Sequence, residues 1–237
     1  MTIFSWKISP INLFWLRLLI HKPMMLRFYR HWRESLKREH SVIEDDFPWM
    51  VYEAVSWLES YLKPGMEVFE WGSGGSTLFF ASRVHFVVTV EHDPNWYAIV
   101  SKQLSDLNIQ NVHFVLCKPE RTDLLSEIYT STDERYKGLS FQHYAETIDS
   151  YPDNSFDLVV VDGRARPGCM KHAIPKIRPG GYLLLDNSDR ESYTPGKKAV
   201  ATWLSCEFYG PGPYNKILWS TTIWQKPESW GTYKGGS

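Results

Sequence analysis

An acidic side chain stands directly before a cluster of glycines in the segment EWGSGGS at residues 70–76, which follows the apolar run MEVF. Glycines adopt positive backbone φ angles at little cost and let the backbone approach a ligand closely. The free N–H groups at the start of a following helix favour an anionic group such as a carboxylate. The segment therefore predicts a ligand-binding turn, and the alternative is a plain tight turn.

A second acidic residue, Glu91, ends the next predicted strand, 19 residues after Gly72. A carboxylate at this spacing can accept hydrogen bonds from both hydroxyls of a ribose. The glycine turn and Glu91 together predict a purine ribonucleoside ligand. The alternative for Glu91 is an exposed acidic strand end.

The charge of Glu70 discriminates between ribonucleoside ligands. Because close like charges repel each other, a carboxylate in the turn disfavours the pyrophosphate of a dinucleotide and favours an ammonium group. A NAD-dependent oxidoreductase would carry G-x-G-x-x-G without an acidic residue at its start, and this sequence shows the opposite. S-adenosylmethionine, which carries an ammonium, a carboxylate, a ribose and an adenine, fits the pattern.

Four motifs in order resemble the class I S-adenosylmethionine-dependent methyltransferases. EWGSGGS follows their first motif, an acidic residue, any residue and then G-x-G-x-G, with Ser76 in the last place, a departure that would tighten the turn. The others are VEHD at 90–93, SFDLVVVDG at 155–163 and IRPGGYLLLDN at 177–187. The resemblance extends from about residue 45 to residue 226 and implies that family's Rossmann-like fold.

The resemblance also implies roles for individual residues. The Glu70 turn would hold the methionine part of the cofactor, Glu91 would bind the ribose, and His92 would lie beside the adenine. Asp162 is the candidate catalytic residue. The predicted cofactor-binding residues are Glu70, Gly72, Ser73, Gly74, Gly75, Glu91, His92 and Asp162.

Asp162, Asp186 and Asn187 end two neighbouring strands of the predicted sheet. Carboxylate and amide oxygens are the hard ligands that Mg²⁺ prefers, and the arrangement resembles the metal site of catechol-type and caffeoyl-CoA-type O-methyltransferases. A metal would orient a substrate's oxygens and lower the pKa of its hydroxyl. Against this, the chain continues as RARPG at 164–168 without the lysine those enzymes use. The alternative is that Asp162 contacts the cofactor and Asp186–Asn187 cap a strand.

These residues need a framework of alternating strands and helices. Apolar spacing of three and four predicts a helix over 46–62, and Asp93 and Pro94 predict the start of another. A polar stretch at 120–138 predicts a loop. The predicted strands are 66–71, 84–91, 111–117, 156–162, 182–187 and 217–226, and further helices are expected over 141–148, 170–177 and 195–204. This order predicts an α/β fold with a doubly wound, mostly parallel sheet and an antiparallel C-terminal edge.

The first forty residues differ from the rest because they are basic and contain the apolar run INLFWLRLLI at 11–20. That run is about half of the roughly 20 residues that a membrane-spanning helix needs. Residues 1–40 could lie on an anionic membrane surface or pack as a helical extension on the domain or on a dimer partner. We expect a helical extension over 1–44, a methyltransferase-like domain over 45–228 and a flexible tail over 229–237.

Composition excludes some classes of partner. A formal net charge of -1 gives no global electrostatic reason to expect a nucleic acid. The three cysteines are widely spaced and form no C-x-x-C pair, so neither a disulfide framework nor a zinc site is indicated. A reducing, cytoplasmic location fits best, with the option of peripheral membrane contact.

The sequence thus predicts an S-adenosylmethionine-dependent methyltransferase that acts on an oxygen of a small-molecule or saccharide-like substrate, with Mg²⁺ as an optional second cofactor. Asp189, Arg190, Tyr193 and the turn at 209–215 would lie at the substrate rim by topology. The alternatives are a NAD-dependent oxidoreductase, a polyamine-synthase-like aminopropyl transferase, and a non-catalytic Rossmann-like module that binds a membrane or a partner.

Overall fold

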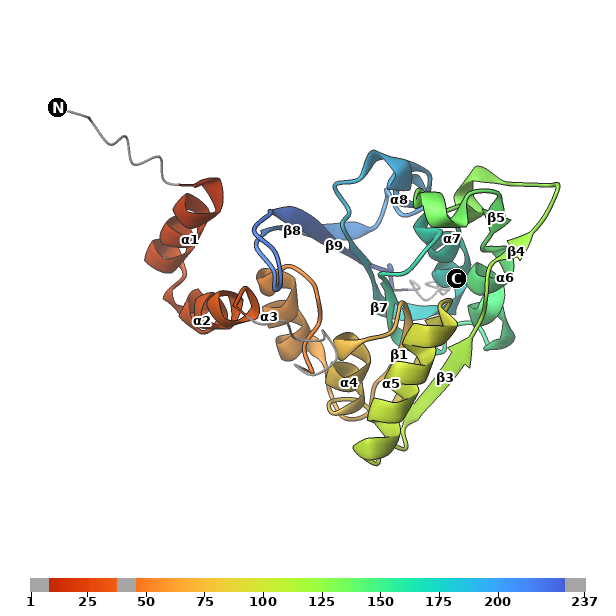
Figure 1. The fold of residues 1–237 in the computed structure, drawn as a ribbon, viewed down its shortest axis with the longest axis horizontal. Helices are drawn as coiled ribbons and strands as arrows, with labels where there is room; N and C mark the ends of the chain where they lie inside the picture. The colour runs from red at the N-terminus through yellow and green to blue at the C-terminus, as the bar shows by residue number, and fades with distance from the viewer. Residues whose placement is uncertain (1–8, 38–45, 229–237) are drawn as a thin grey trace, which may run out of the picture.

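The structure is a computed structural model that describes residues 9–37 and 46–228. A seven-stranded sheet forms its centre (Figure 1). Its strands are β1 (Glu67–Trp71), β2 (Phe86–Glu91), β3 (Val112–Leu116), β6 (Phe156–Val161), β7 (Ile177–Asp186), β8 (Leu204–Gly210) and β9 (Trp219–Gln225). The helices are α1 (Pro10–His21), α2 (Leu26–Ser35), α3 (Tyr52–Tyr61), α4 (Gly75–Ala81), α5 (Pro94–Asp106), α6 (Gln142–Glu146), α7 (Arg166–Lys176) and α8 (Thr194–Ala199). Two short strands, β4 (Glu120–Arg121) and β5 (Leu139–Ser140), form a separate pair.

The strand order is β3-β2-β1-β6-β7-β9-β8. Strands β3, β2, β1, β6 and β7 are parallel, and β9 and β8 add an antiparallel edge. Chain order reverses between β1 and β6, which is the switch point where ligands bind in doubly wound sheets. The predicted fold class, including its antiparallel edge, is confirmed.

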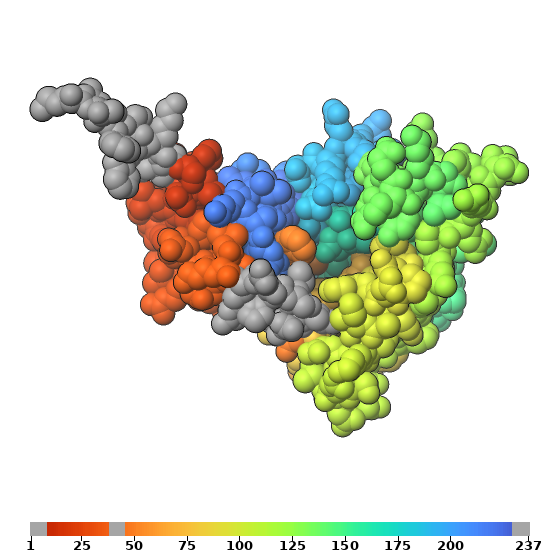
Figure 2. Space-filling model, viewed as in Figure 1, coloured from red at the N-terminus to blue at the C-terminus, as the bar shows by residue number. Residues whose placement is uncertain are grey.

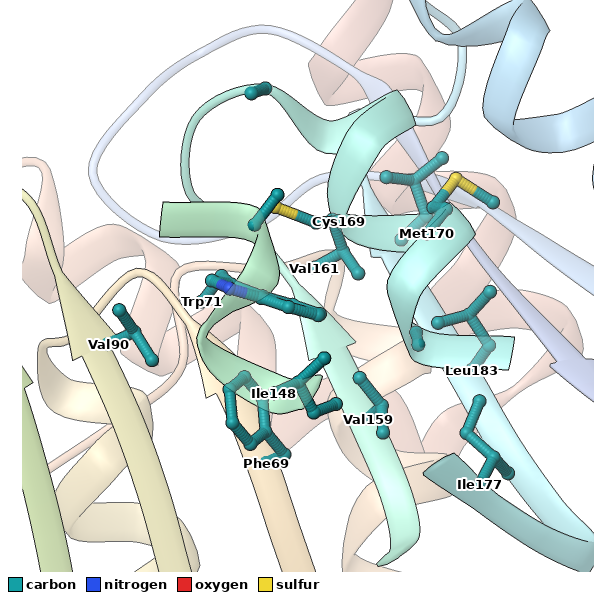
Figure 3. Packing of buried hydrophobic residues seen from close by; sticks show 14 of the residues in the cluster. Phe69, Trp71, Val90, Ile148, Val159, Val161, Cys169, Met170, Ile177 and Leu183 are labelled. Carbon is teal, nitrogen blue, oxygen red and sulfur yellow. The ribbon is translucent and has the colours of Figure 1, made fainter. Parts of the chain in front are cut away.

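Apolar side chains cover both faces of the sheet, as parallel strands require. On one face, Phe69 and Trp71 of β1 pack with residues of β6 and α7; Figure 3 shows Trp71, Val161, Cys169 and Met170 in this layer. On the other face, Val68 of β1 packs with α3 and α4. Because side chains alternate along a strand, Glu70 points to the same face as Val68 and is carried into an apolar layer.

The N-terminal helices pack against α3 at one end of the molecule (Figure 1). Trp15 of α1 and Phe28 and Trp32 of α2 are almost fully buried, in the same cluster as Tyr52. The expected helical extension is thus present over the described residues 9–37. In the described ranges, no helix is long and apolar enough to cross a membrane. The boundaries of the extension and the domain stay a prediction, and the predicted tail at 229–237 lies outside the described residues.

Three local predictions need correction. The helix predicted over 46–62 begins only at Tyr52, because Asp46 has a positive φ of 46° and Pro48 follows it. The strand predicted over 182–187 already begins at Ile177, because β7 continues through Gly180, which has a φ of 78°, and its register with β6 shifts. The helix predicted over 195–204 ends at Ala199, and Leu204 instead begins β8, a strand that the sequence did not indicate.

Candidate functional site

The glycine turn lies where the carboxyl ends of β1 and β6 meet. Gly72 has a φ of 98°, and a Cβ atom there would lie 2.9 Å from the backbone nitrogen of Gly163, which follows β6. The Gly72 N–H donates to the Val90 carbonyl at 3.0 Å, and the Asp162 N–H donates to the Trp71 carbonyl at 3.0 Å. The two turns are therefore locked together, and glycine at position 72 is required by both its conformation and its surroundings.

Glu91 is held at the end of β2 by donors from both sides. Its Oε2 accepts from the Ser73 hydroxyl at 2.9 Å and from the Ser73 N–H at 3.3 Å, while its Oε1 accepts from the N–H groups of His92 and Asp93 at 2.7 and 2.8 Å. Burial acts to raise the pKa of Glu91, but the hydrogen bonds from His92 and Asp93 outweigh it and leave the pKa below its usual value. The carboxylate is therefore ionised and ties the glycine turn to the second strand.

A cavity of about 410 Å³ lies over these residues. Gly72, Ser73, Glu91, His92 and Asp162 line it, so the structure brings most of the predicted cofactor residues to one place. Gly75 begins α4 and Gly74 is the residue before the helix, and neither of them lines this cavity.

Two aromatic residues that the sequence analysis did not single out as ligand contacts shape this cavity. The Trp96 indole N–H donates to the Ser73 carbonyl at 2.8 Å and so fixes the glycine turn from the side of α5. The Tyr136 hydroxyl lies 2.9 Å from Nε2 of His92. The segment around Tyr136 is also tied down by Asp133, which forms an ion pair with Arg164 at 3.2 Å. The loop predicted over 120–138 therefore forms part of the wall of this cavity.

Glu70 lies beneath the turn and does not line the cavity. Its carboxylate is fully buried and accepts hydrogen bonds from the hydroxyls of Ser76, at 2.8 Å, and Thr77. Burial raises the pKa of Glu70 to about 7 even though both hydroxyls favour the ionised form. In this structure Glu70 fixes the first turn of α4. Ser76, the departure from the glycine motif, supplies one of the two hydroxyls.

A buried arginine, Arg166, contacts both Asp162 and Asp186. Its guanidinium lies 2.9 Å from Oδ1 of Asp162 and donates to the backbone carbonyls of Asp162, Gly163 and Asp186. Oδ1 of Asp186 instead accepts from the Trp219 indole N–H at 3.0 Å. Burial raises the pKa of both Asp162 and Asp186; Arg166 opposes that shift, and for Asp162 the Asp186 charge adds to it.

This arrangement does not support the predicted magnesium site. The Asp162 carboxylate is paired with a guanidinium, and the Asp186 side chain is engaged by Trp219 and by the hydroxyl of Thr221. Across residues 9–37 and 46–228, no three His, Cys, Asp or Glu side chains are grouped so that they could hold a metal ion. The donor set does not fit Mg²⁺. Arg166 was missed because the sequence shows only a charged residue after a strand.

A second cavity of about 400 Å³ adjoins the first and shares Asp162, Arg166 and Arg190 with it. Its other lining residues include Trp49, Asn187, Asn215 and Trp219. Of the residues predicted at the rim, Arg190 borders both cavities, and Asn215 of the 209–215 turn borders the second. Tyr193 lines a third cavity of about 360 Å³ on the other side of Arg190.

His113, His143 and His172 lie outside these three cavities. His113 is bonded to the Tyr151 hydroxyl, His143 lies beside Glu120, and His172 bridges Tyr129 and Asp149.

The strand order, the glycine turn at the switch point and the acidic residue after the second strand together define the Rossmann-like fold of the class I S-adenosylmethionine-dependent methyltransferases. No protein-family model matches the sequence, and no curated protein does. Solved structures do match the fold. An rRNA methylase from Streptococcus thermophilus is 14% identical, with 73% of this chain and 95% of that chain covered and a TM-score of 0.52.

Two further structures agree with this assignment of the fold. A protein from Clostridium thermocellum described as a candidate rRNA methylase is 16% identical, with 75% and 96% of the two chains covered and a TM-score of 0.53. A candidate methyltransferase from Streptococcus mutans, in complex with SAH, is 12% identical, with 73% and 96% covered and a TM-score of 0.50. At these identities the comparisons establish the fold.

Proposed function

We propose that this protein is an S-adenosylmethionine-dependent methyltransferase. The observation that carries the proposal is the cavity at the switch point, which is lined by Gly72, by Gly163 and by the ionised Glu91 carboxylate. A ribonucleoside that carries an amino acid head requires glycines that let the backbone approach it closely and an acidic residue at a strand end to bind its ribose. The methyltransferase fold supports the same conclusion.

The lining residues divide the proposed cofactor site into parts. Glu91 would accept hydrogen bonds from the ribose hydroxyls, with the Ser73 hydroxyl giving up its present bond to Oε2. Gly72 and Ser73 would contact the methionine part, and His92 and Tyr136 would flank the adenine. When bound, S-adenosylmethionine supplies an electrophilic methyl group. Glu70 would act without touching the cofactor: its hydrogen bonds with Ser76 and Thr77 fix the start of α4 and thereby the shape of the glycine turn.

The second cavity is the proposed acceptor site because Asp162 lines both cavities. Its aromatic and amide lining suits a small polar molecule such as a saccharide, with Trp49 and Trp219 as apolar surfaces and Asn187 and Asn215 as hydrogen-bonding groups. Asp162 is the proposed proton acceptor for an acceptor hydroxyl, because its raised pKa favours proton uptake. Arg166 would position it and has too high a pKa to act as a base itself.

Calorimetric titration tests the cofactor part of the proposal. We expect S-adenosylmethionine and S-adenosylhomocysteine to bind and NAD not to bind. Glu91→Gln should weaken binding by about 1–3 kcal/mol, or roughly 5- to 150-fold, because it removes a charge-assisted contact. Glu67→Gln, at the opposite end of β1, is the matched control and should bind as the wild type does. No heat of binding at millimolar S-adenosylmethionine would refute the proposal.

Transfer of a labelled methyl group tests the acceptor. Saccharides and small hydroxylated molecules are compared with total RNA, since two of the matching structures are described as rRNA methylases or candidates for that activity. We expect label in the small molecules, and an Asp162→Asn variant should lose turnover while it retains cofactor affinity within a few fold. Labelling of RNA alone would contradict the predicted substrate class and the reasoning from the low net charge.

A further inference from the structure

Helix α1 is apolar on two opposite sides. Ile11, Trp15 and Leu18 are buried against the rest of the protein. On the other side, Leu13, Leu16 and Ile20 are 57%, 51% and 67% exposed. Spacings of three and four residues place each set along one line of a helix, and the two lines are roughly opposite each other.

The exposed side continues beyond the helix. Met24, in the turn before α2, is 72% exposed, and we call Leu13, Leu16, Ile20 and Met24 the outer ridge. A surface helix normally carries polar residues opposite its buried stripe. A group of large aliphatic side chains in that position marks an interaction surface. Figures 1 and 2 show α1 at the end of the molecule farthest from α5 and α6.

A positive charge flanks the outer ridge. Arg17 follows Leu13 by four residues and precedes Ile20 by three, so it flanks the ridge directly. Lys22 and Arg27 are neutralised by Glu53 and Glu59 of α3. Arg17, Arg30 and Arg33 are exposed and, within the described ranges, have no carboxylate partner.

We propose that the outer ridge docks on an anionic lipid surface, with α1 lying in the plane of the interface. The apolar side chains would enter the boundary of the acyl chains, and Arg17 would meet the headgroups. At 1.5 Å per residue, the 12 residues of α1 span about 18 Å, which is less than the roughly 30 Å of a bilayer core. The helix therefore lies on the membrane and does not span it.

A second copy of the chain is a poorer occupant of this surface. In a two-fold symmetric contact over the ridge, Arg17 of one copy would face the same positively charged patch on the other. Such a contact would bring like charges together, whereas an anionic surface complements both the apolar ridge and its basic flank.

The docking surface is linked to the proposed acceptor cavity. The Trp32 indole N–H of α2 donates to the Asn215 carbonyl at 2.9 Å, and the Ser35 hydroxyl accepts from the Tyr214 N–H at 3.0 Å. Asn215 lines the second cavity. Docking would thus hold that cavity near the lipid surface, where a membrane-bound acceptor could reach it. This last step rests on the proposed methyl transfer, whereas the docking itself does not.

Vesicle co-sedimentation of the full chain tests the docking. We expect binding to vesicles of phosphatidylcholine and phosphatidylserine at 4:1, and at least tenfold weaker binding to phosphatidylcholine alone. The double variant Leu16→Asp and Ile20→Asp should lose binding at least tenfold, because it places charge on the ridge. Leu124→Asp is the control, since Leu124 is 87% exposed, follows β4 and is not part of the outer ridge, so the change should have no effect.

Circular dichroism confirms that each variant is folded, and an Arg17→Glu variant, which leaves the ridge intact, should also weaken binding severalfold. Three results would overturn the proposal: no binding of the wild type to anionic vesicles, equal binding to neutral vesicles, or a ridge-dependent dimer in light scattering without lipid binding. Methyl-transfer activity is measured separately, so a negative result for membrane docking would not refute the proposed methyl transfer, and the reverse also holds.

Discussion

Replacing Glu70 by glutamine should remove a large part of the pH dependence of stability. Glu70 is fully buried on the α3 and α4 side of β1, and burial raises its pKa from 4.5 to about 7. Between these two values the folded protein binds a proton that the unfolded chain has already released. The stabilisation is therefore complete below pH 4.5 and is lost as the pH rises through about 7. The glutamine side chain of the variant does not titrate in this range.

The size of the effect follows from the shift. A change of one pKa unit corresponds to about 1.4 kcal/mol, so the full shift corresponds to about 3 kcal/mol. Between pH 5 and pH 7.5 about 2 kcal/mol of this should be observable, since both states are partly titrated at the ends of that window. The glutamine keeps a carbonyl acceptor for one hydroxyl, and the second hydroxyl, of Ser76 or Thr77, can turn to accept from the amide.

Urea unfolding at pH 5.0, 6.0, 7.0 and 7.5, followed by tryptophan fluorescence, gives the free energy of unfolding of both proteins. We expect the difference between the Glu70→Gln variant and the wild type to move in favour of the variant by about 2 kcal/mol over this range. The control is Glu67→Gln, which removes a carboxylate from the half-exposed start of the same strand. Two parallel curves, with a constant difference between variant and wild type, would refute the reasoning.

Three other predictions test the site. Gly72→Ala should lower the free energy of unfolding by about 2 kcal/mol or more and weaken cofactor binding, because φ is 98° and the new Cβ would lie 2.9 Å from a backbone nitrogen. Thermal melts measure the loss of stability and calorimetry measures the loss of affinity. An unchanged melting temperature would contradict this prediction. Arg166→Met should destabilise the fold by about 3–5 kcal/mol in denaturant unfolding, since Asp162 loses its partner, and Arg166→Lys should recover part of that loss. Tyr136→Phe removes the hydrogen bond to His92 and should lower cofactor affinity about 2- to 10-fold by calorimetry; wild-type affinity would place this loop outside the site.

The parts of the fold that the sequence predicts are those with strong local patterns. The buried run ending at Val161 and the N-cap Asp93 with Pro94 determine their elements almost alone, and β6 and α5 are confirmed. Strand β8 has no such pattern. Most of its residues are exposed, with Leu204 78% exposed, so neither alternation nor an apolar run marks it. It forms because β9 offers a free edge, which is a tertiary property.

The same distinction holds at the site. Gly72, Glu91 and Asp162 end consecutive or neighbouring parallel strands, so a parallel sheet brings them together without further information. The burial of Glu70 depends on which face of β1 the helices α3 and α4 cover. The contact of Tyr136 with His92 depends on the path of a loop with little local pattern. Neither can be read from spacing.

Arg166 shows how one tertiary contact changes the chemistry that a motif allows. From sequence, Asp162, Asp186 and Asn187 indicate oxygen ligands for a cation; in the structure, a guanidinium already neutralises that space. A guanidinium balances charge, but it neither accepts a proton nor offers the open coordination positions of a metal ion. For the proposed methyl transfer, the proton of an acceptor hydroxyl must therefore pass to a carboxylate or to solvent. Asp162 is the acidic residue that borders both cavities, and its raised pKa makes it the better acceptor.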